Sequence, residues 1–238
     1  MKILIVNDDS ISAPGIAVLA KTAAEFGEVT VVAPAQQCSA LSQKLTLRET
    51  LSLEQVHTFP APVKEAWKLG GTPVDCVKVA LDCIVKEKPD WVFSGINNGY
   101  NAGFDVAYSG TLGAAFEAAR SGIPAIAFSI AAEKHLEAAE RYLHGVIREL
   151  LTEKPGTGSV WNVNFPSMKL GTPKGILRDR TVATVSMFRE HYERSILEDG
   201  SVVLSCVGTP TEDAAIPAGS DAEAVRKGYI SIGKVRAF

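Results

Sequence analysis

The chain has 238 residues, 46% of them hydrophobic and 21% charged, with a formal net charge of -3 at pH 7. This composition is typical of a globular protein with one large α/β domain, and the absence of a Lys or Arg run argues against a surface built for a nucleic-acid duplex. No stretch reaches the roughly 20 apolar residues that span a membrane, and no basic segment with a cleavage site opens the chain, so we expect a cytoplasmic protein without a membrane partner.

The first predicted element is a buried strand that ends in two carboxylates. Residues 3–6 form an uninterrupted aliphatic run, typical of a parallel strand covered on both faces, and Asp8 and Asp9 follow it closely. Ligands of open α/β sheets bind outside the carboxyl ends of the strands. Because adjacent carboxylates repel each other unless a cation lies between them, we interpret the pair as a site for Mg2+, Mn2+ or Ca2+. The alternative is that one aspartate only caps the next helix.

The following segments predict a β-α-β unit. Pro14 and Gly27 bracket a helix with an apolar face, and residues 29–33 form a second aliphatic strand. Residues 34–45 are polar and predict a loop at the same sheet edge as the aspartates. Within this loop Ser39 either supplies an oxygen ligand or only stabilises a turn.

The middle of the chain predicts further strands and a polar loop. Alternating leucines over residues 44–53 indicate a half-exposed strand, and residues 72–84 begin with Thr-Pro and continue with the apolar spacing of a helix. Residues 91–93 predict a short strand. Residues 94–103 after it contain three glycines and three asparagines, which favours a loop whose backbone can approach a ligand closely and whose amides can coordinate it.

A helix rich in small residues is predicted from residues 108–111, Tyr-Ser-Gly-Thr, to Gly122. Hydroxyl groups and unpaired N–H groups at a helix N-terminus suit a phosphate. The alternative is that Thr111 or Ser109 is a helix cap and nothing more. No GxGxxG or Walker A sequence occurs, so neither a dinucleotide site nor a P-loop is predicted.

The C-terminal part departs from the α/β pattern. Residues 125–130 predict a buried strand and residues 135–151 an amphipathic helix, so we assign residues 1–152 to a Rossmann-like core. We expect residues 153–238 to form a β-rich extension that makes subunit contacts. Its predicted elements are a strand at 160–165, hairpin strands at 181–187 and 201–207, a loop around His191, a short helix at 221–227 and a strand at 229–232.

Seven motifs, in order along almost the whole chain, resemble those of the stationary-phase survival protein SurE family. They are Ile-Val-Asn-Asp-Asp at 5–9, Cys-Ser-Ala at 38–40, Gly-Thr-Pro-Val-Asp-Cys-Val at 71–77, Ser-Gly-Ile-Asn-Asn-Gly-Tyr-Asn at 94–101, Tyr-Ser-Gly-Thr at 108–111, Asn-Val-Asn-Phe-Pro at 162–166 and Ala-Val-Arg-Lys-Gly-Tyr-Ile-Ser-Ile at 224–232. The chain departs from the family pattern where Ser10 replaces a usual glycine and Cys38 a frequent arginine.

The resemblance implies a single phosphatase domain with a three-layer, Rossmann-like α/β fold and a mostly parallel sheet. The implied activity is hydrolysis of nucleoside 5'-monophosphates, with 3'-monophosphates and short polyphosphate as further candidate substrates, by a homodimer or homotetramer. It needs one divalent metal ion, Mg2+ or Mn2+, and the family's metal-site residues fall on Asp8, Asp9, Ser39 and Asn97. The residues implied to contact phosphate are Asn101, Ser109, Gly110 and Thr111.

Two questions stay open at the level of sequence. Either a water or one of the two aspartates attacks phosphorus, and Asp8 and Asp9 are the candidate catalytic residues in both cases. The alternative function is a non-catalytic or phosphorylatable module that binds a nucleotide or phosphate in the same acidic pocket. An aspartyl-phosphate hydrolase of the haloacid dehalogenase type is disfavoured because it uses Asp-x-Asp spacing, whereas here the aspartates are adjacent.

Overall fold

The computed structural model describes residues 1–236. Its strands are β1 (Lys2–Val6), β2 (Glu28–Pro34), β3 (Leu53–Gln55), β4 (Glu65–Leu69), β5 (Trp91–Asn98), β6 (Ala125–Ile130), β7 (Ser159–Phe165), β8 (Ile176–Leu177), β9 (Phe188–Ile196), β10 (Val202–Pro210) and β11 (Ile230–Arg236). Its helices are α1 (Pro14–Ala23), α2 (Pro73–Val79), α3 (Gly110–Arg120), α4 (Glu137–Leu150) and α5 (Asp221–Arg226), with short helical turns η1 (Ala80–Ile84), η2 (Phe104–Tyr108), η3 (Met168–Leu170) and η4 (Asp213–Ala215).

A nine-stranded sheet forms the centre of the protein, in the order β3-β4-β2-β1-β5-β6-β7-β11-β8. The six strands from β4 to β7 are parallel, whereas β3 and β11 run antiparallel to their neighbours β4 and β7. Counted along the chain, the parallel strands have the order 3-2-1-4-5-6 of a doubly wound fold. The predicted Rossmann-like α/β class is confirmed, and the strand order reverses between β1 and β5.

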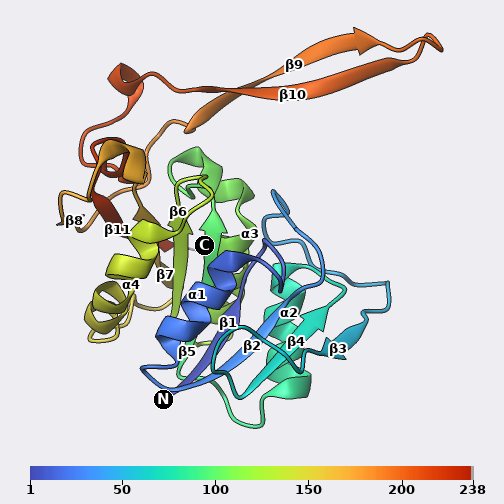
Figure 1. The fold of residues 1–238 in the computed structure, drawn as a ribbon, viewed down its shortest axis with the longest axis vertical. Helices are drawn as coiled ribbons and strands as arrows, with labels where there is room; N and C mark the ends of the chain where they lie inside the picture. The colour runs from blue at the N-terminus through green and yellow to red at the C-terminus, as the bar shows by residue number, and fades with distance from the viewer. Residues whose placement is uncertain (237–238) are drawn as a thin grey trace.

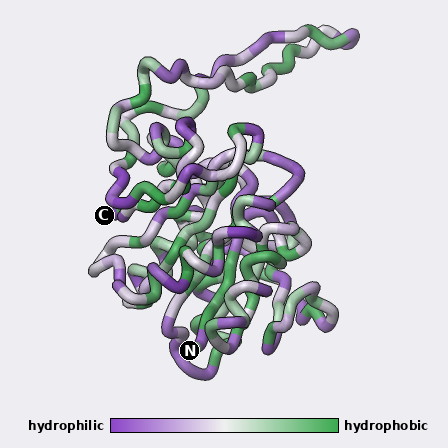
Figure 2. The backbone as a smooth tube through the Cα atoms, turned by 60° about the vertical axis from the view of Figure 1, so that its left-hand side comes forward, coloured by the Kyte–Doolittle hydropathy of each residue, from purple (hydrophilic) through white to green (hydrophobic). Residues whose placement is uncertain are grey.

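The sheet separates two apolar clusters, each covered by a pair of helices (Figure 1). Helices α1 and α4 pack against each other over one face, and α2 and α3 over the other. Figure 2 shows that hydrophobic residues line the central strands while hydrophilic ones dominate much of the periphery. Helix α3 connects β5 to β6 and helix α4 connects β6 to β7, so both connections move one strand along the sheet in the same direction. The two helices lie on opposite faces of the sheet. The β6-α4-β7 connection therefore has the opposite hand to β5-α3-β6. No helix in residues 1–236 is long and apolar enough to cross a membrane.

Most predicted elements of the first 165 residues are confirmed, but the expected strand over residues 44–53 is wrong. The strand there begins only at Leu53, the first residue of β3. The preceding segment is held by side chains instead, since the backbone N–H of Thr46 donates to Asp75 Oδ1 at 3.0 Å and Thr72 Oγ1 donates to the carbonyl of Lys44 at 2.6 Å. This segment is therefore held by hydrogen bonds to the start of α2 and not by a ladder of backbone hydrogen bonds, and of its leucines Leu47 is exposed.

Two strands differ from the sequence expectation. Strand β4 pairs in parallel with β2 but was not predicted, because its sequence, Glu-Ala-Trp-Lys-Leu, mixes charged and apolar residues. Strand β5 was predicted to end at Phe93 and continues to Asn98. The extension matters for the site, because it places Asn97 at the carboxyl end of a strand and not within a loose loop.

The C-terminal residues contribute three strands to the main sheet and one separate hairpin. Strands β7, β8 and β11 belong to the nine-stranded sheet, while β9 and β10 pair only with each other. This hairpin, residues 188–210, extends far from the rest of the protein, beyond the carboxyl ends of the parallel strands (Figure 1). We call it the arm. The expected strand at 181–187 and the expected loop around His191 are both wrong, since 188–196 is the first strand of the arm.

Ser10 provides a test of backbone strain beside the acidic pair. Its φ is 94°, in the region that favours glycine, whereas Ser12 has no positive φ. We expect Ser10→Gly to increase the free energy of unfolding by about 0.5 to 1 kcal/mol, because removing Cβ relieves more strain than the added chain entropy costs. Urea unfolding measures this. The matched change Ser12→Gly should lower stability slightly, and equal losses in both variants would contradict the prediction.

Candidate active site

A polar depression of about 170 Å³ lies at the carboxyl ends of β1 and β5. This is the point at which the strand order reverses, where doubly wound sheets bind their ligands. Its lining consists of Asp8, Asp9, Gln37, Ser39, Ala40, Asn97, Asn98, Asn101, Asp105, Tyr108 and Ser109. Six of the eight sequence-predicted site residues are thus brought together, and the other two, Gly110 and Thr111, do not line the depression.

Asp8 is a buried carboxylate held by the first turn of α3. Only 4% of the residue is exposed, and its Oδ1 accepts the Thr111 hydroxyl at 2.7 Å while its Oδ2 accepts the Thr111 backbone N–H at 3.2 Å. A Cβ atom added to Gly110 would lie 3.0 Å from Asp8, so a glycine at this position lets the helix come close. Burial raises the pKa of Asp8 from 3.8 to about 6, and the neighbouring Asp9 adds to the increase despite the opposing hydrogen bonds from Thr111.

Asp9 is more exposed and is held by the other side of the depression. Its Oδ2 accepts the backbone N–H of Asn98 at 2.9 Å, and Gln37 Nε2 lies 3.5 Å from its Oδ1. The same Gln37 nitrogen donates to Ser39 Oγ at 3.0 Å. Partial burial raises the pKa of Asp9 as well. Gln37 therefore links two predicted metal-site residues, a role that no sequence motif signalled.

Asn97 and Asn101 are fixed in different ways. Asn97 Nδ2 donates to the carbonyl of Gly99 at 2.8 Å, which leaves its Oδ1 as the group suited to a cation. Asn101 is 5% exposed, and its Nδ2 donates to Ser129 Oγ at 2.7 Å. Its backbone N–H donates to Asn164 Oδ1 at 2.9 Å.

Residues far along the chain hold the Asn101 loop, and sequence reasoning gave them no role. Asn162 and Asn164 of β7 both donate to the carbonyl of Asn101, at 2.8 and 3.1 Å. Asp221, at the start of α5, is 3% exposed; its Oδ1 accepts N–H groups of Gly103 at 3.2 Å and Ala183 at 2.9 Å. The Asn-Val-Asn repeat at 162–164 was the available signal, because two asparagines on one face of a buried strand need partners.

The N-terminus of α3 adjoins the depression, and its cap residue Ser109 lines it. Ser109 caps the helix, since its Oγ accepts the N–H of Leu112 at 3.0 Å. The N–H of Thr111 is used by Asp8, but that of Gly110 has no acceptor within residues 1–236. Together with the positive end of the helix dipole, this N–H suits an anion. The capping role expected as the alternative is present, and it leaves room for a ligand.

The donor set of the depression fits a hard cation. Carboxylate oxygens of Asp8 and Asp9 occur with the amide oxygen of Asn97 and the hydroxyl of Ser39, and no basic side chain lines the depression to neutralise the two acids. Within residues 1–236 no group of three or more His, Cys, Asp and Glu side chains could hold a metal ion. A cation site here therefore depends on the two carboxylates together with uncharged oxygens.

Cys38 adds no positive charge to the site. Its backbone N–H donates to the carbonyl of Asp8 at 2.7 Å, and its Sγ lies 3.7 Å from the carbonyl of Gly71. Burial and, to a smaller extent, the nearby Asp8 raise the pKa of the thiol. The thiol is consequently neutral at pH 7.

Comparisons with known proteins show which proteins this chain is similar to. Residues 3–194 match the protein family described as "Survival protein SurE". The chain is 38% identical to "5'-nucleotidase SurE" of Synechococcus sp. (strain JA-3-3Ab), covering 98% of this chain and 90% of that protein. It is also 38% identical to "5'/3'-nucleotidase SurE" of Cronobacter sakazakii, covering 98% and 88%. The crystal structure of the Sure protein from Aquifex aeolicus superimposes with a TM-score of 0.83 at 31% identity, covering 100% of this chain and 94% of that one.

The raised pKa of Asp8 has a measurable effect on stability. A carboxyl whose pKa rises on folding favours the folded state below pH 3.8, and this contribution is lost as the pH rises through about 6. Asparagine does not ionise, so with a chelator present Asp8→Asn should not lose stability in this way as the pH rises. We expect the variant to gain stability relative to the unsubstituted protein between pH 4 and pH 8, by about 2 to 3 kcal/mol. Urea unfolding across this range measures the difference, and a difference that does not change with pH would contradict the assignment.

Proposed function

This chain belongs to the SurE family of survival proteins, and we propose that it is a phosphomonoesterase that hydrolyses nucleoside 5'-monophosphates to nucleoside and phosphate. The observation that carries the proposal is the pairing of two carboxylates after β1 with the donor end of α3 across one small depression. The relatives of this chain named 5'-nucleotidase or 5'/3'-nucleotidase support the substrate class. Nucleoside 3'-monophosphates and short polyphosphate are further candidate substrates.

Asp8, Asp9, Ser39 and Asn97 would hold one divalent cation, Mg2+ or Mn2+. A cation held there polarises a phosphoryl oxygen and lowers the pKa of a bound water. Thr111 orients the Asp8 carboxylate with two hydrogen bonds, and Asn98 and Gln37 orient that of Asp9. Because these partners fix the directions of the carboxylate oxygens, little reorganisation is needed when a cation enters.

The phosphate would bind at the N-terminus of α3. The Ser109 hydroxyl and the neighbouring Gly110 N–H would donate to phosphate oxygens, and Asn101 lines the same depression as Ser109. Thr111 contributes through Asp8 in this structure, and direct contact of its side chain with phosphate stays a prediction. Donors that are fixed before the substrate arrives stabilise the charge that develops on the equatorial oxygens during phosphoryl transfer.

The arm supports the proposal of a homodimer or homotetramer. All residues of β9 are exposed, and so are all but one of β10. The register of the hairpin places most of the large exposed apolar side chains of both strands on one face, where they have no cover within residues 1–236, and Val203 on the other: the first face holds Phe188, Tyr192, Ile196, Val202 and Leu204. A two-stranded ribbon is marginally stable alone in water, and such an apolar face marks an interface, which we assign to a second copy of the chain.

The activity is tested by measuring phosphate release from a panel of nucleoside monophosphates with Mn2+, with Mg2+ and with a chelator. We expect release only with metal, and a loss of roughly a hundredfold or more in Asp8→Asn, because an interaction of several kcal/mol with the transition state is removed. The exposed Asp82 provides the control Asp82→Asn, which should keep full activity. Circular dichroism verifies the fold. Metal-independent release, or full activity of Asp8→Asn, would overturn the proposal.

The assembly is tested by analytical ultracentrifugation of two lysine variants in β10. Leu204 lies on the apolar face of the arm, and Ser205 points to the opposite face. We expect Leu204→Lys to lower the assembly mass, because it places a charge in the interface, whereas Ser205→Lys should keep the mass of the unsubstituted protein. A monomeric unsubstituted protein, or no change in Leu204→Lys, would contradict the prediction.

A further inference from the structure

Asp105 lines the depression without taking part in the proposed metal or phosphate sites. It belongs to the short helical turn η2, between the Asn101 loop and the start of α3. Hydrolysis of a nucleoside monophosphate releases a sugar hydroxyl, which leaves as a strongly basic alkoxide unless it receives a proton. The groups assigned so far hold the cation and the phosphate, and none of them supplies this proton.

The lining of the depression offers few proton donors. It contains no histidine, lysine or arginine, so the remaining candidates are Asp105 and Tyr108. Tyr108 is 63% exposed. Asp105 is half-buried, and burial raises the pKa of its carboxyl, with Glu190 adding to the increase and hydrogen bonds from Met187 and Ser186 opposing it. A carboxyl in such surroundings holds a proton at higher pH than a solvated one.

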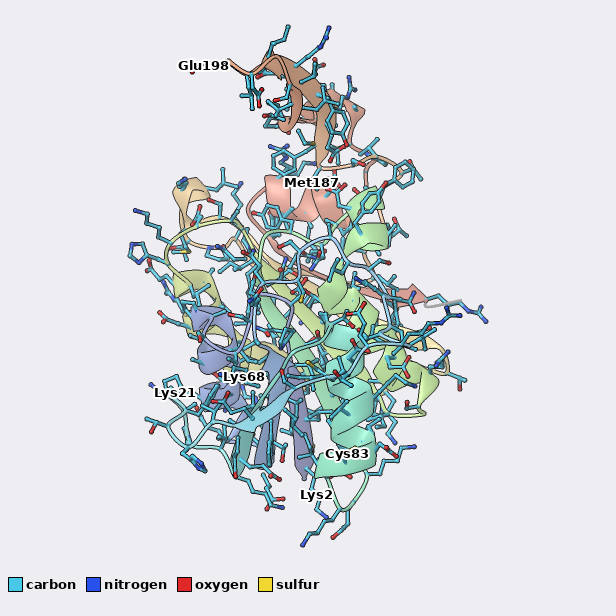
Figure 3. All side chains as sticks on the ribbon, turned by 90° about the vertical axis from the view of Figure 1, so that its right-hand side faces the viewer. Lys2, Lys21, Lys68, Cys83, Met187 and Glu198 are labelled. Carbon is cyan, nitrogen blue, oxygen red and sulfur yellow. The ribbon has the colours of Figure 1, made fainter. Side chains whose placement is uncertain are left out.

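Asp105 is also fixed in position. Its Oδ2 accepts the backbone N–H of Met187 at 3.0 Å, and the neighbouring N–H of Phe104 donates to the carbonyl of Val185 at 3.0 Å. Figure 3 shows Met187 at the base of the arm and Glu198 at its tip. The carboxyl is thus attached to the segment from which the arm extends and not to a freely moving loop, which is the condition that a proton donor needs for aligned transfer.

We propose that Asp105 is the general acid of the reaction, a catalytic residue that protonates the leaving sugar oxygen. The inference rests on the proposed phosphatase function. As the oxygen of the attacking water bonds to phosphorus, the bond between phosphorus and the sugar oxygen breaks and the proton moves from the Asp105 carboxyl to that oxygen. The attacking water loses one proton to solvent, and the Asp105 carboxylate regains one from solvent before the next turnover.

The experiment compares two substrates that differ in their need for this proton. Adenosine 5'-monophosphate releases an alkoxide, while p-nitrophenyl phosphate releases a stable phenolate. With Mn2+ present, we expect Asp105→Asn to lower kcat/KM for the nucleotide by about a hundredfold or more and to leave that for p-nitrophenyl phosphate nearly unchanged. In the unsubstituted protein, kcat/KM for the nucleotide should fall at high pH, where the Asp105 carboxyl loses its proton. This fall should be absent in Asp105→Asn.

The design separates a proton donor from a structural role. Asparagine keeps an acceptor for the Met187 N–H, and thermal unfolding together with Mn2+ affinity verifies the fold and the metal site. Asp82→Asn serves again as the control. Equal losses on both substrates, or no loss on either, would overturn the assignment of Asp105 while leaving the phosphatase function intact. If the unsubstituted protein releases phosphate from neither substrate, the proposed function fails and the assignment falls with it.

Discussion

The buried carboxylate of Asp8 under the first turn of α3 is the contact on which the site depends. It joins the end of the first strand to a helix that begins about a hundred residues later along the chain, and it uses both donor groups of Thr111. Two requirements follow. A small residue, Gly110, must stand where the helix passes the carboxylate, and a compensating cation is favoured because burial disfavours the charged form of Asp8 and raises its pKa to about 6. The same arrangement leaves the N–H of Gly110, at the start of α3, without an acceptor within residues 1–236, so that it suits an anion.

The site combines parts of unequal rigidity. Asp8 lies at the end of a strand that is buried on both faces, whereas Asn101 lies in a loop that owes its position to side chains from β6, β7 and α5. Asp105 depends on the segment before the arm. Groups that would bind the cation therefore come from the centre of the sheet, and groups that would contact the rest of the substrate come from its C-terminal margin. Changes in that margin can tune specificity without disturbing the cation site.

Local sequence patterns predicted the parallel core and the polar segments that line the depression, because buried strands, helix caps and the polar residues after them are specified within a few residues. The hairpin strand predicted at 201–207 is present as β10, but strand β4 was not predicted because its sequence mixes charged and apolar residues, and β9, the first strand of the arm, was not predicted because it is polar. Gln37, Asp105 and Asp221 were missed for another reason. Gln37 contacts the side chains of Asp9 and Ser39, whereas Asp105 and Asp221 accept backbone N–H groups from distant segments, and no pattern along the chain records such contacts.

The position of the loop anchors in the chain has a consequence for biosynthesis. During synthesis Asp8 and Asp9 emerge before the asparagines of β7 that hold the Asn101 carbonyl, which follow about 150 residues later, and before Asp221, which follows later still. A nascent chain thus carries the acidic pair long before the opposite wall of the depression can be fixed. A polypeptide that stops before β7 and α5 therefore lacks the side chains that fix the Asn101 loop, and the depression beside Asp8 and Asp9 has no ordered wall on that side.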